Sequence, residues 1–192
     1  MSTLPKHASA LLDRYRASST GVVTDALGRL GIGSWMDDVL PVSGARSAVG
    51  RARTLTYAPR AGARRSLSMY AAMQACEPGD ILVVATGTTR SWLLGENMAH
   101  FAMYNELGAI VTDGRNRDAN DIRALQFPVF SRGFAVRPPT ADLELILADG
   151  PVNCGGAQIW PGDLLVADAD GVVVVPHAAA EALIGHCGSS ES

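Results

Sequence analysis

The chain has 192 residues, of which 47% are hydrophobic and 18% charged, and this composition suffices for one compact domain over residues 1–192 with a sizeable core. Its formal net charge of −3 offers no basic field to a nucleic acid, and its arginines lack the interleaved aromatic residues that stack on bases. No apolar run approaches the length of a membrane span. We therefore expect neither a nucleic-acid partner nor a membrane association.

The cysteines and the amino-terminal segment bear on the compartment. Cys76, Cys154 and Cys187 are odd in number and show no CxxC spacing, which disfavours a zinc knuckle or a disulfide framework. Residues 1–19 carry charges inside their apolar part, unlike the apolar core of a secretory signal. We expect a reducing, cytoplasmic location, and a disordered tail at residues 188–192.

Apolar periodicity and turn residues predict an α/β chain. In chain order we expect a helix near the amino terminus, a strand over residues 50–57, a helix over 66–76, a strand over 81–85, a helix over 96–107, a strand over 109–112 and a helix over 117–125. Strands over residues 129–130, 151–154, 164–167 and 171–175 follow, and the segment HAAAEALIGHC after Pro176 is helical.

Residues 58–68 place three arginines ahead of the second predicted helix, at Arg60, Arg64 and Arg65. Two interpretations are open. These side chains either recognise a second carboxylate or a phosphate, or they belong to a solvated helix start.

The helix over residues 96–107 begins directly after Gly95, and Gly108 offers its stop. The first turn of a helix carries unpaired N–H groups and a partial positive charge, so the backbone of Glu96, Asn97 and Met98 can hold a carboxylate or a developing oxyanion. Gly95, without a side chain, lets a ligand approach closely. This helix start is a candidate oxyanion site.

A loop rich in charge follows the strand over residues 109–112. Arg115, Arg117, Asp118 and Asp121 fall within seven positions, so a planar cation for an oxyanion stands beside hard oxygen ligands for Mg²⁺. These are the two parts needed to stabilise an enolate. The alternative is an ordinary solvated loop with an aspartate at a helix N-cap.

With these residues in place, the chain resembles the class II pyruvate aldolases for 4-hydroxy-4-methyl-2-oxoglutarate and 4-carboxy-4-hydroxy-2-oxoadipate, together with the related RraA-like regulators of ribonuclease E. Glu96 stands at the acidic position of the aldolases, twenty residues intervene, and Arg117 and Asp118 follow, with Asp121 three residues later. The resemblance extends over roughly residues 10–185 through GVVTDALGRLG, EPGDILVVATG and PGDLLVADADGVVVVP. It implies a swivelling β/β/α domain.

The resemblance also implies roles for individual residues. Backbone groups of Gly95, Glu96, Asn97 and Met98 would bind the carboxylate and keto oxygens of a small 2-oxo acid, and Arg117 would contact the same substrate. Asp118 would bind a divalent metal, Mg²⁺ or Mn²⁺. Glu96 and Asp121 would hold metal-bound waters in the outer shell.

The mechanism that the resemblance implies is a retro-aldol cleavage. A base removes the C4 hydroxyl proton and the C3–C4 bond breaks to give pyruvate enolate, which Arg117 and the metal stabilise. Decarboxylation of oxaloacetate leaves the same enolate, so it is expected as a side activity.

His100 occupies a position where the aldolases usually carry a small hydroxyl residue. It lies one helical turn after Glu96 and could face the same cleft as a catalytic proton carrier. The alternative is a histidine that serves only packing. Exchange of His100 for Thr with unchanged turnover would remove it from the mechanism.

Family members form homotrimers, or pairs of trimers, with active sites at subunit interfaces, and the resemblance implies such an assembly here. Trp35, Met36 and Trp92 are candidate interface anchors or core residues. After Pro176 only Glu181 and Glu191 remain as acids that could complete a neighbouring subunit's metal site.

Two further functions remain open beside the lyase. The first is a protein-binding regulator of ribonuclease E, the branch that generally lacks the acid that is Glu96 here. The second is a family member recruited to a different enolate-type reaction. The joint presence of Glu96, Arg117, Asp118 and Asp121 favours the enzyme.

Overall fold

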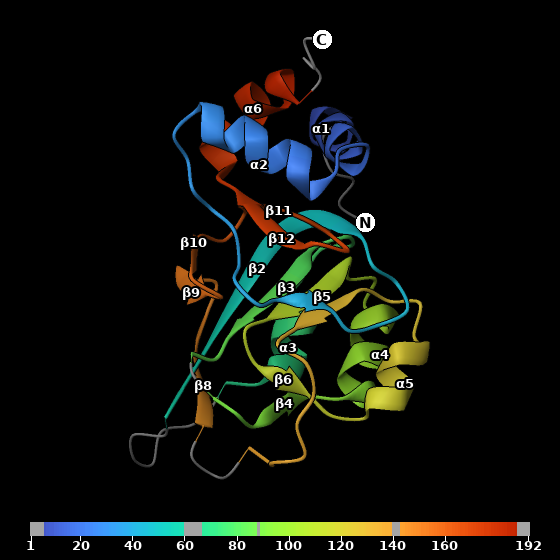
Figure 1. Cartoon of the computed structure of the whole chain (residues 1–192). Helices are drawn as coiled ribbons and strands as arrows, with labels where there is room; N and C mark the ends of the chain where they lie inside the picture. The colour runs from blue at the N-terminus through green and yellow to red at the C-terminus, as the bar shows by residue number, and fades with distance from the viewer. Residues whose placement is uncertain (1–5, 60–66, 88, 140–142, 188–192) are drawn as a thin grey trace.

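The computed structural model describes residues 6–59, 67–87, 89–139 and 143–187 (Figure 1). Arg60, Arg64, Arg65, Glu191 and the predicted tail at 188–192 lie outside these residues. The helices are α1 Lys6–Arg16, α2 Thr20–Arg29, α3 Met69–Gln74, α4 Glu96–Tyr104, α5 Ala119–Ala124, η1 His177–Ala179 and α6 Ala180–His186. The strands are β1 Leu40–Pro41, β2 Ala48–Pro59, β3 Ile81–Ala85, β4 Trp92–Leu94, β5 Ala109–Thr112, β6 Arg115–Asn116, β7 Val129–Ser131, β8 Leu143–Ala148, β9 Val152–Cys154, β10 Ala157–Ile159, β11 Leu164–Asp168 and β12 Gly171–Val175.

One eight-stranded sheet dominates the fold, with the order β1-β7-β5-β3-β2-β11-β12 and β8 paired to β2. Strands β2, β3, β5 and β7 run parallel, so their carboxyl ends meet at one edge. The sheet curls towards closure because the Met36 N–H donates to the Val172 carbonyl at 3.0 Å and Trp35 bridges to Val173. The result is a nearly closed, barrel-like sheet.

The core has three parts, and strand β3 shows how the sequence divides two of them. All five β3 residues are buried, as expected of a central parallel strand. Ile81, Val83 and Ala85 face the inside of the barrel with Phe130, whereas Leu82 and Val84 pack against the layer of α3, α4 and α5.

Helices α1, α2 and α6 cover the β11–β12 hairpin at one end of the molecule (Figure 1). Val23, Leu27 and Leu183 pack there with Val173 and Val175 to form the third core cluster. Tyr15 is fully buried in this cluster, and its hydroxyl donates to the Ala180 carbonyl at 2.8 Å. Glu181 is exposed at this end, on α6.

The predicted α/β class is confirmed, and the predicted strands over residues 81–85, 109–112 and 171–175 have the observed bounds. Strand β2 is longer than the strand predicted over 50–57, because its first half pairs with β11 and its second half pairs with β8. Five strands were not predicted, namely β1, β4, β6, β8 and β10. Four of them have only two or three residues, too few for a period to show, whereas β8 carries an apolar run that could have been recognised.

The expected helix stop at Gly108 was wrong. Helix α4 ends at Tyr104, and Glu106 takes the left-handed conformation with φ 57°. Gly108 is instead required for close packing, because a Cβ there would lie 2.7 Å from the Gly79 carbonyl oxygen. The helix predicted over 66–76 shortens to α3, and the one over 117–125 begins later because Asp118 is itself left-handed.

Within the described ranges, no helix combines the length and the apolar character needed to cross a membrane. The three cysteines carry free thiols. Cys154 is fully buried, and burial raises the pKa of its thiol. Burial also raises the pKa of the Cys76 thiol, to about 11.

Candidate active site

A short parallel pair of strands, β4 and β6, assembles the site at the carboxyl edge of the main sheet. Trp92 pairs with Arg115, and Leu94 with Asn116. Directly beyond this pair, the Arg117 N–H donates to the Leu94 carbonyl at 2.9 Å. Gly95 and Arg117, which are 22 positions apart in the chain, therefore lie side by side.

Gly95 lies at the N-cap of α4, where the side chains of Asp118 and Arg117 leave no room for a Cβ. Its φ of −144° is open to any residue, but a Cβ there would lie 2.5 Å from Asp118 Oδ2 and 3.1 Å from Arg117 Nε. The close approach predicted for this glycine is therefore made by the chain's own Asp118 and Arg117. No larger residue fits without displacing them.

Asp118 occupies the N-cap position of α5, yet its side chain makes no capping hydrogen bond there. Its backbone is left-handed, with φ 59° and ψ 50°, a conformation that aspartate adopts more readily than most residues other than glycine and that Asp38 and Asp149 also adopt in this chain. Its carboxylate turns towards α4, where Oδ2 accepts the Glu96 N–H at 3.1 Å. Asp118 is therefore not the side-chain cap of its own helix α5; it binds an N–H in the first turn of α4.

Arg117 is held from two directions. Its Nε lies 3.4 Å from Asp118 Oδ2, and its guanidinium carbon lies 4.1 Å from the centre of the Trp92 ring. Stacking on an indole favours a cation and limits its orientations. The side chain nevertheless stays 48% exposed, so the guanidinium remains available to an anion.

The other predicted site residues of α4 and α5 differ in exposure, and none of them is among the residues that line the cavity beside Arg117. The His100 Nε2 atom lies 3.3 Å from Glu96 Oε1, with both side chains exposed on one face of α4. Asn97 is exposed, and the Met98 N–H donates to the Gly95 carbonyl at 3.1 Å. Asp121 is exposed in the first turn of α5.

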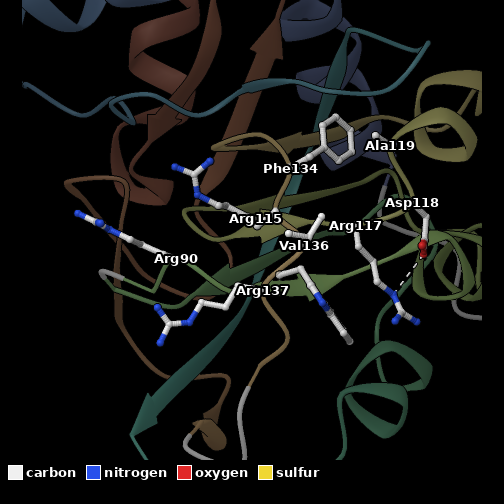
Figure 2. Close-up of a pocket in the computed structure, with 10 residues that line it drawn as sticks. Arg90, Arg115, Arg117, Asp118, Ala119, Phe134, Val136 and Arg137 are labelled. Atoms are coloured by element: carbon white, nitrogen blue, oxygen red, sulfur yellow. Dashed lines mark ion pairs between the residues drawn. The ribbon is translucent and has the colours of Figure 1, made fainter.

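A cavity of about 910 Å³ opens beside Arg117 and Asp118 (Figure 2). Its charged lining consists of one carboxylate and four guanidinium groups, and its apolar lining comes from aromatic and small side chains. The lining residues are Arg90, Trp92, Arg115, Arg117, Asp118, Ala119, Phe134, Ala135, Val136 and Arg137.

Sequence reasoning missed much of this cavity. Arg90, Phe134 and Arg137 were given no role, and Trp92 was considered only as an interface anchor or core residue. Arg90 does follow a predicted strand, where loops commonly carry chemistry. No pattern in the sequence connects Arg137 to this edge of the sheet. The structure connects them by a hydrogen bond, in which the Trp92 N–H donates to the Arg137 carbonyl at 3.0 Å.

The two other candidate interface anchors have different surroundings. Trp35 is 49% exposed, whereas Met36 is buried in the barrel core. Of the two interpretations of Met36, interface anchor or core residue, the structure supports the core residue.

The donor set at Asp118 matches a hydrated hard cation. In the described part of the chain, no three His, Cys, Asp or Glu side chains are grouped closely enough to hold an ion by protein ligands alone. Mg²⁺ is commonly bound through one or two carboxylates while it keeps several waters. Asp118, with Glu96 close by, fits such an ion better than a structural zinc.

Comparisons with known proteins identify the family of the chain. The model of the RraA-like family, described as Aldolase/RraA, matches residues 20–174. A relative from Halalkalibacterium halodurans, provisionally named a 4-hydroxy-4-methyl-2-oxoglutarate aldolase, is 32% identical over 166 residues, which cover 86% of this chain and 76% of the relative.

Two solved structures share the fold over nearly the whole chain. Streptomyces coelicolor RraAS2, described as an unusual member of the RNase ES inhibitor RraA protein family, has a TM-score of 0.84 and 29% identity, covering 96% of this chain and 92% of that one. An uncharacterized protein from Pseudomonas syringae pv. tomato has a TM-score of 0.82 and 27% identity, covering 93% and 85%.

Proposed function

The chain belongs to the RraA-like family, and from this premise we propose that it is a divalent-metal-dependent carbon-carbon lyase that releases pyruvate from a 4-hydroxy-2-oxo acid. Decarboxylation of oxaloacetate is the expected side activity. One observation carries the proposal: Arg117 and Asp118 converge on the start of α4, with Gly95 leaving room for both. The aldolase name of the 32% identical relative supports the same reaction class.

Arg117 is the residue that we assign to the developing charge. Its guanidinium, stacked on Trp92, presents fixed donors to the keto-acid end of a substrate. Stabilisation of an enolate by donors that are already oriented lowers the barrier without reorganisation during the reaction. Of the four backbone N–H groups expected to bind the substrate, those of Glu96 and Met98 already donate to Asp118 and to the Gly95 carbonyl. We therefore assign the further donors at this helix start to Gly95 and Asn97.

Asp118 would hold Mg²⁺ or Mn²⁺, and Glu96 and Asp121 would orient waters of that ion. When bound, such a cation supplies Lewis acidity towards the 2-keto oxygen. The Asp118 carboxylate lines the cavity beside Arg117 and makes no capping hydrogen bond to the start of α5, which supports this assignment.

Glu96 and His100 are the groups that we assign to proton transfer. Their 3.3 Å contact allows a proton to move between a carboxylate and an imidazole that both reach solvent. Retro-aldol cleavage requires removal of the C4 hydroxyl proton, whereas decarboxylation does not. As the acceptor of that hydroxyl proton, the pair is needed for the retro-aldol reaction only, and the enolate formed in both reactions takes its C3 proton from solvent to give pyruvate.

Pyruvate release, coupled to lactate dehydrogenase, tests the proposal. Oxaloacetate and 4-carboxy-4-hydroxy-2-oxoadipate are supplied with Mg²⁺ or Mn²⁺, or with EDTA. We expect cation-dependent release that falls at least about 100-fold in Arg117→Ala and in Asp118→Asn. Arg16→Ala, an exposed arginine of α1, is the control. Absence of release from both substrates by the folded wild type would overturn the lyase.

The likeness to RraAS2 supports a second candidate, a protein-binding regulator of a ribonuclease E-type enzyme. Inhibition of that ribonuclease by this protein, undiminished by Arg117→Ala, would favour it. We also propose a homotrimer, or a pair of trimers, as the assembly; sedimentation or light scattering tests it directly.

A further inference from the structure

Two arginine–aspartate pairs of this molecule differ in kind. Arg53 and Asp149 form a bidentate pair, with two hydrogen bonds of 2.8 and 2.7 Å. In the site, the closest approach of Arg117 Nε to Asp118 Oδ2 is 3.4 Å, and the geometry of this contact makes no hydrogen bond (Figure 2). A guanidinium and a carboxylate fit each other best in the bidentate arrangement. The open arrangement of Arg117 and Asp118 therefore needs a cause.

The indole of Trp92 supplies that cause. The guanidinium carbon of Arg117 lies 4.1 Å from the centre of the indole ring, so one face of the cation is stacked on it. The guanidinium must leave the ring in order to rotate towards the carboxylate. For partly exposed groups a cation–π contact and an ion pair contribute comparable free energies, so the stacking is strong enough to hold the open arrangement.

The backbone fixes the indole and the arginine relative to each other. Trp92 lies in β4, where it pairs with Arg115 of β6 and its N–H donates to the Arg137 carbonyl at 3.0 Å. The Arg117 N–H donates to the Leu94 carbonyl of the same strand at 2.9 Å. Both partners of the stack are thus anchored on one pair of strands, and the stack is present before any ligand binds.

The open arrangement leaves atoms of both charged groups without partners among the described residues. Asp118 Oδ2 accepts the Glu96 N–H at 3.1 Å, whereas Oδ1 accepts no hydrogen bond. The Nη1 and Nη2 atoms of Arg117 likewise donate none. In a bidentate pair such as Arg53 with Asp149, both carboxylate oxygens and two guanidinium nitrogens are engaged. Closure of Arg117 on Asp118 would therefore occupy Oδ1 and an Nη atom in one movement.

We propose that Trp92 is a positioning residue, whose indole keeps the Arg117 guanidinium from closing a bidentate pair with Asp118. The carboxylate then stays available to a divalent cation, and the guanidinium stays available to a keto acid. This inference rests on the proposed function, which assigns these two ligands. It gives Trp92 a role that differs from both the interface anchor and the core residue considered for it in the sequence.

Binding of Mn²⁺ alone to the whole protein, followed by the electron paramagnetic resonance signal of the free ion, tests the proposal. Trp92→Leu keeps an apolar side chain but removes the aromatic face, whereas Trp92→Phe keeps such a face. Trp160→Leu, at an exposed tryptophan directly after β10, is the matched control. Trp92→Leu is also measured in the background of Arg117→Gln, where no guanidinium is left to close on Asp118.

We expect Trp92→Leu to weaken Mn²⁺ binding at least about threefold, because the ion must displace the guanidinium from the carboxylate. Trp92→Phe and Trp160→Leu should stay within about twofold of wild type. In the Arg117→Gln background, Trp92→Leu should change the Mn²⁺ affinity by less than about twofold. An equal loss in both backgrounds would assign Trp92 to packing and overturn the proposal. Unchanged affinity in Trp92→Leu, or no Mn²⁺ binding by wild type, would overturn it as well.

The fluorescence of Trp92 gives a second measurement that does not depend on the folding of Trp92→Leu. The chain has three tryptophans, so Trp92 is the only one left in the double variant W35F/W160F. Arg117→Gln in this variant should change the Trp92 emission, since the stacked cation is removed, whereas Arg16→Gln should not. Identical emission with and without the Arg117 guanidinium would overturn the stacking.

These outcomes are distinguishable from those of the lyase test, because neither measurement requires turnover. A protein that shows the expected changes in Mn²⁺ binding and emission but releases no pyruvate retains the positioning role of Trp92 and loses the lyase. A protein that releases pyruvate and shows neither change retains the lyase and loses the positioning role.

Discussion

Arginines at the two edges of the parallel strands are held in opposite ways. At the amino edge, Arg53 is saturated: its Nε and Nη2 bind the two carboxylate oxygens of Asp149 at 2.8 and 2.7 Å, and its Nη1 donates to the Ala75 carbonyl. At the carboxyl edge, Arg90, Arg115 and Arg137 have no carboxylate partner in the described part of the chain. The guanidinium at the amino edge is bound within the fold, whereas those at the carboxyl edge have no described carboxylate bound to them.

This division follows from the topology of the sheet. In parallel α/β sheets, open or closed, the loops after the strands are free to vary, and ligands bind at the carboxyl ends of the strands. Hydrogen bonding to Asp149 raises the pKa of Arg53 above its ordinary value, so the Arg53 guanidinium stays charged. The contrast teaches that pairing with a carboxylate, more than the count of arginines, distinguishes the two edges of this protein.

Gly95→Ala, at the carboxyl edge, is expected to have the largest effect on turnover. The added Cβ would lie 2.5 Å from Asp118 Oδ2, so the carboxylate and Arg117 must move. A misplacement of about 1 Å at reacting groups lowers turnover about 100-fold or more. Pyruvate release from oxaloacetate measures it.

Gly185→Ala is the matched control, since an added Cβ in α6 would meet no atom within 4 Å. It should leave turnover unchanged and raise stability slightly. Full activity of Gly95→Ala would show that the close approach of Asp118 to α4 has no part in the reaction.

His100→Gln tests whether the exposed pair on α4 does chemistry. Loss of the imidazole should lower retro-aldol turnover about 10- to 100-fold, because the C4 hydroxyl proton loses its acceptor. Oxaloacetate decarboxylation needs no such acceptor and should change less than twofold. The ratio of the two rates is the measurement. An equal change in both reactions, or in neither, would assign His100 to packing or to solvent exposure alone.

Replacement of arginines at the two edges should affect stability differently. Arg53→Gln removes a bidentate pair that is partly exposed, so we expect a loss of about 1 kcal/mol in the free energy of unfolding. Arg137→Gln removes an unpaired cation and should leave stability within about 0.5 kcal/mol of wild type, or raise it. Urea unfolding of both variants is the comparison. A greater loss in Arg137→Gln would mean that the carboxyl edge also depends on its arginines for folding.

The sequence predicted the elements that are long and periodic, and it predicted the charged loop of the site. Strand β3 is buried on both faces and α4 carries one apolar face, so their patterns were readable. The pairing of β4 with β6 was not, because two or three residues show no period and their partnership depends on tertiary contacts.

The conformation of Asp118 and the position of Arg137 also escaped prediction. An aspartate before a helix is usually a cap, and only the packing against Gly95 turns its side chain towards α4. Arg137 reaches the cavity through a backbone hydrogen bond from Trp92, 45 positions earlier in the chain. Contacts of this kind carry no local sequence signature, which is why the charged loop at residues 115–121 could be recognised in the sequence and the place of Arg137 beside it could not.

The smallest effect concerns Asp168, a second saturated charge at the amino edge. Its carboxylate accepts the N–H and hydroxyl of Thr20, each at 2.8 Å, and the Asp170 N–H at 3.0 Å. Burial raises the pKa of Asp168, but these hydrogen bonds outweigh burial and hold the pKa below its ordinary value of 3.8. A carboxyl group with a lowered pKa stabilises the fold above its unfolded pKa, and this stabilisation is lost as the pH falls through the folded value.

Asp168→Asn should therefore lower the free energy of unfolding by about 1 kcal/mol at pH 7, since one first-turn N–H of α2 loses a charged acceptor. The difference between wild type and variant should shrink as the pH falls below about 4, where the unfolded carboxyl group is protonated. Urea unfolding at pH 7 and pH 3 measures this difference. If it were the same at both values, the ionised carboxylate would not be the source of the stability, and the saturated charge at the amino edge would be no more than a hydrogen-bond acceptor of the right shape.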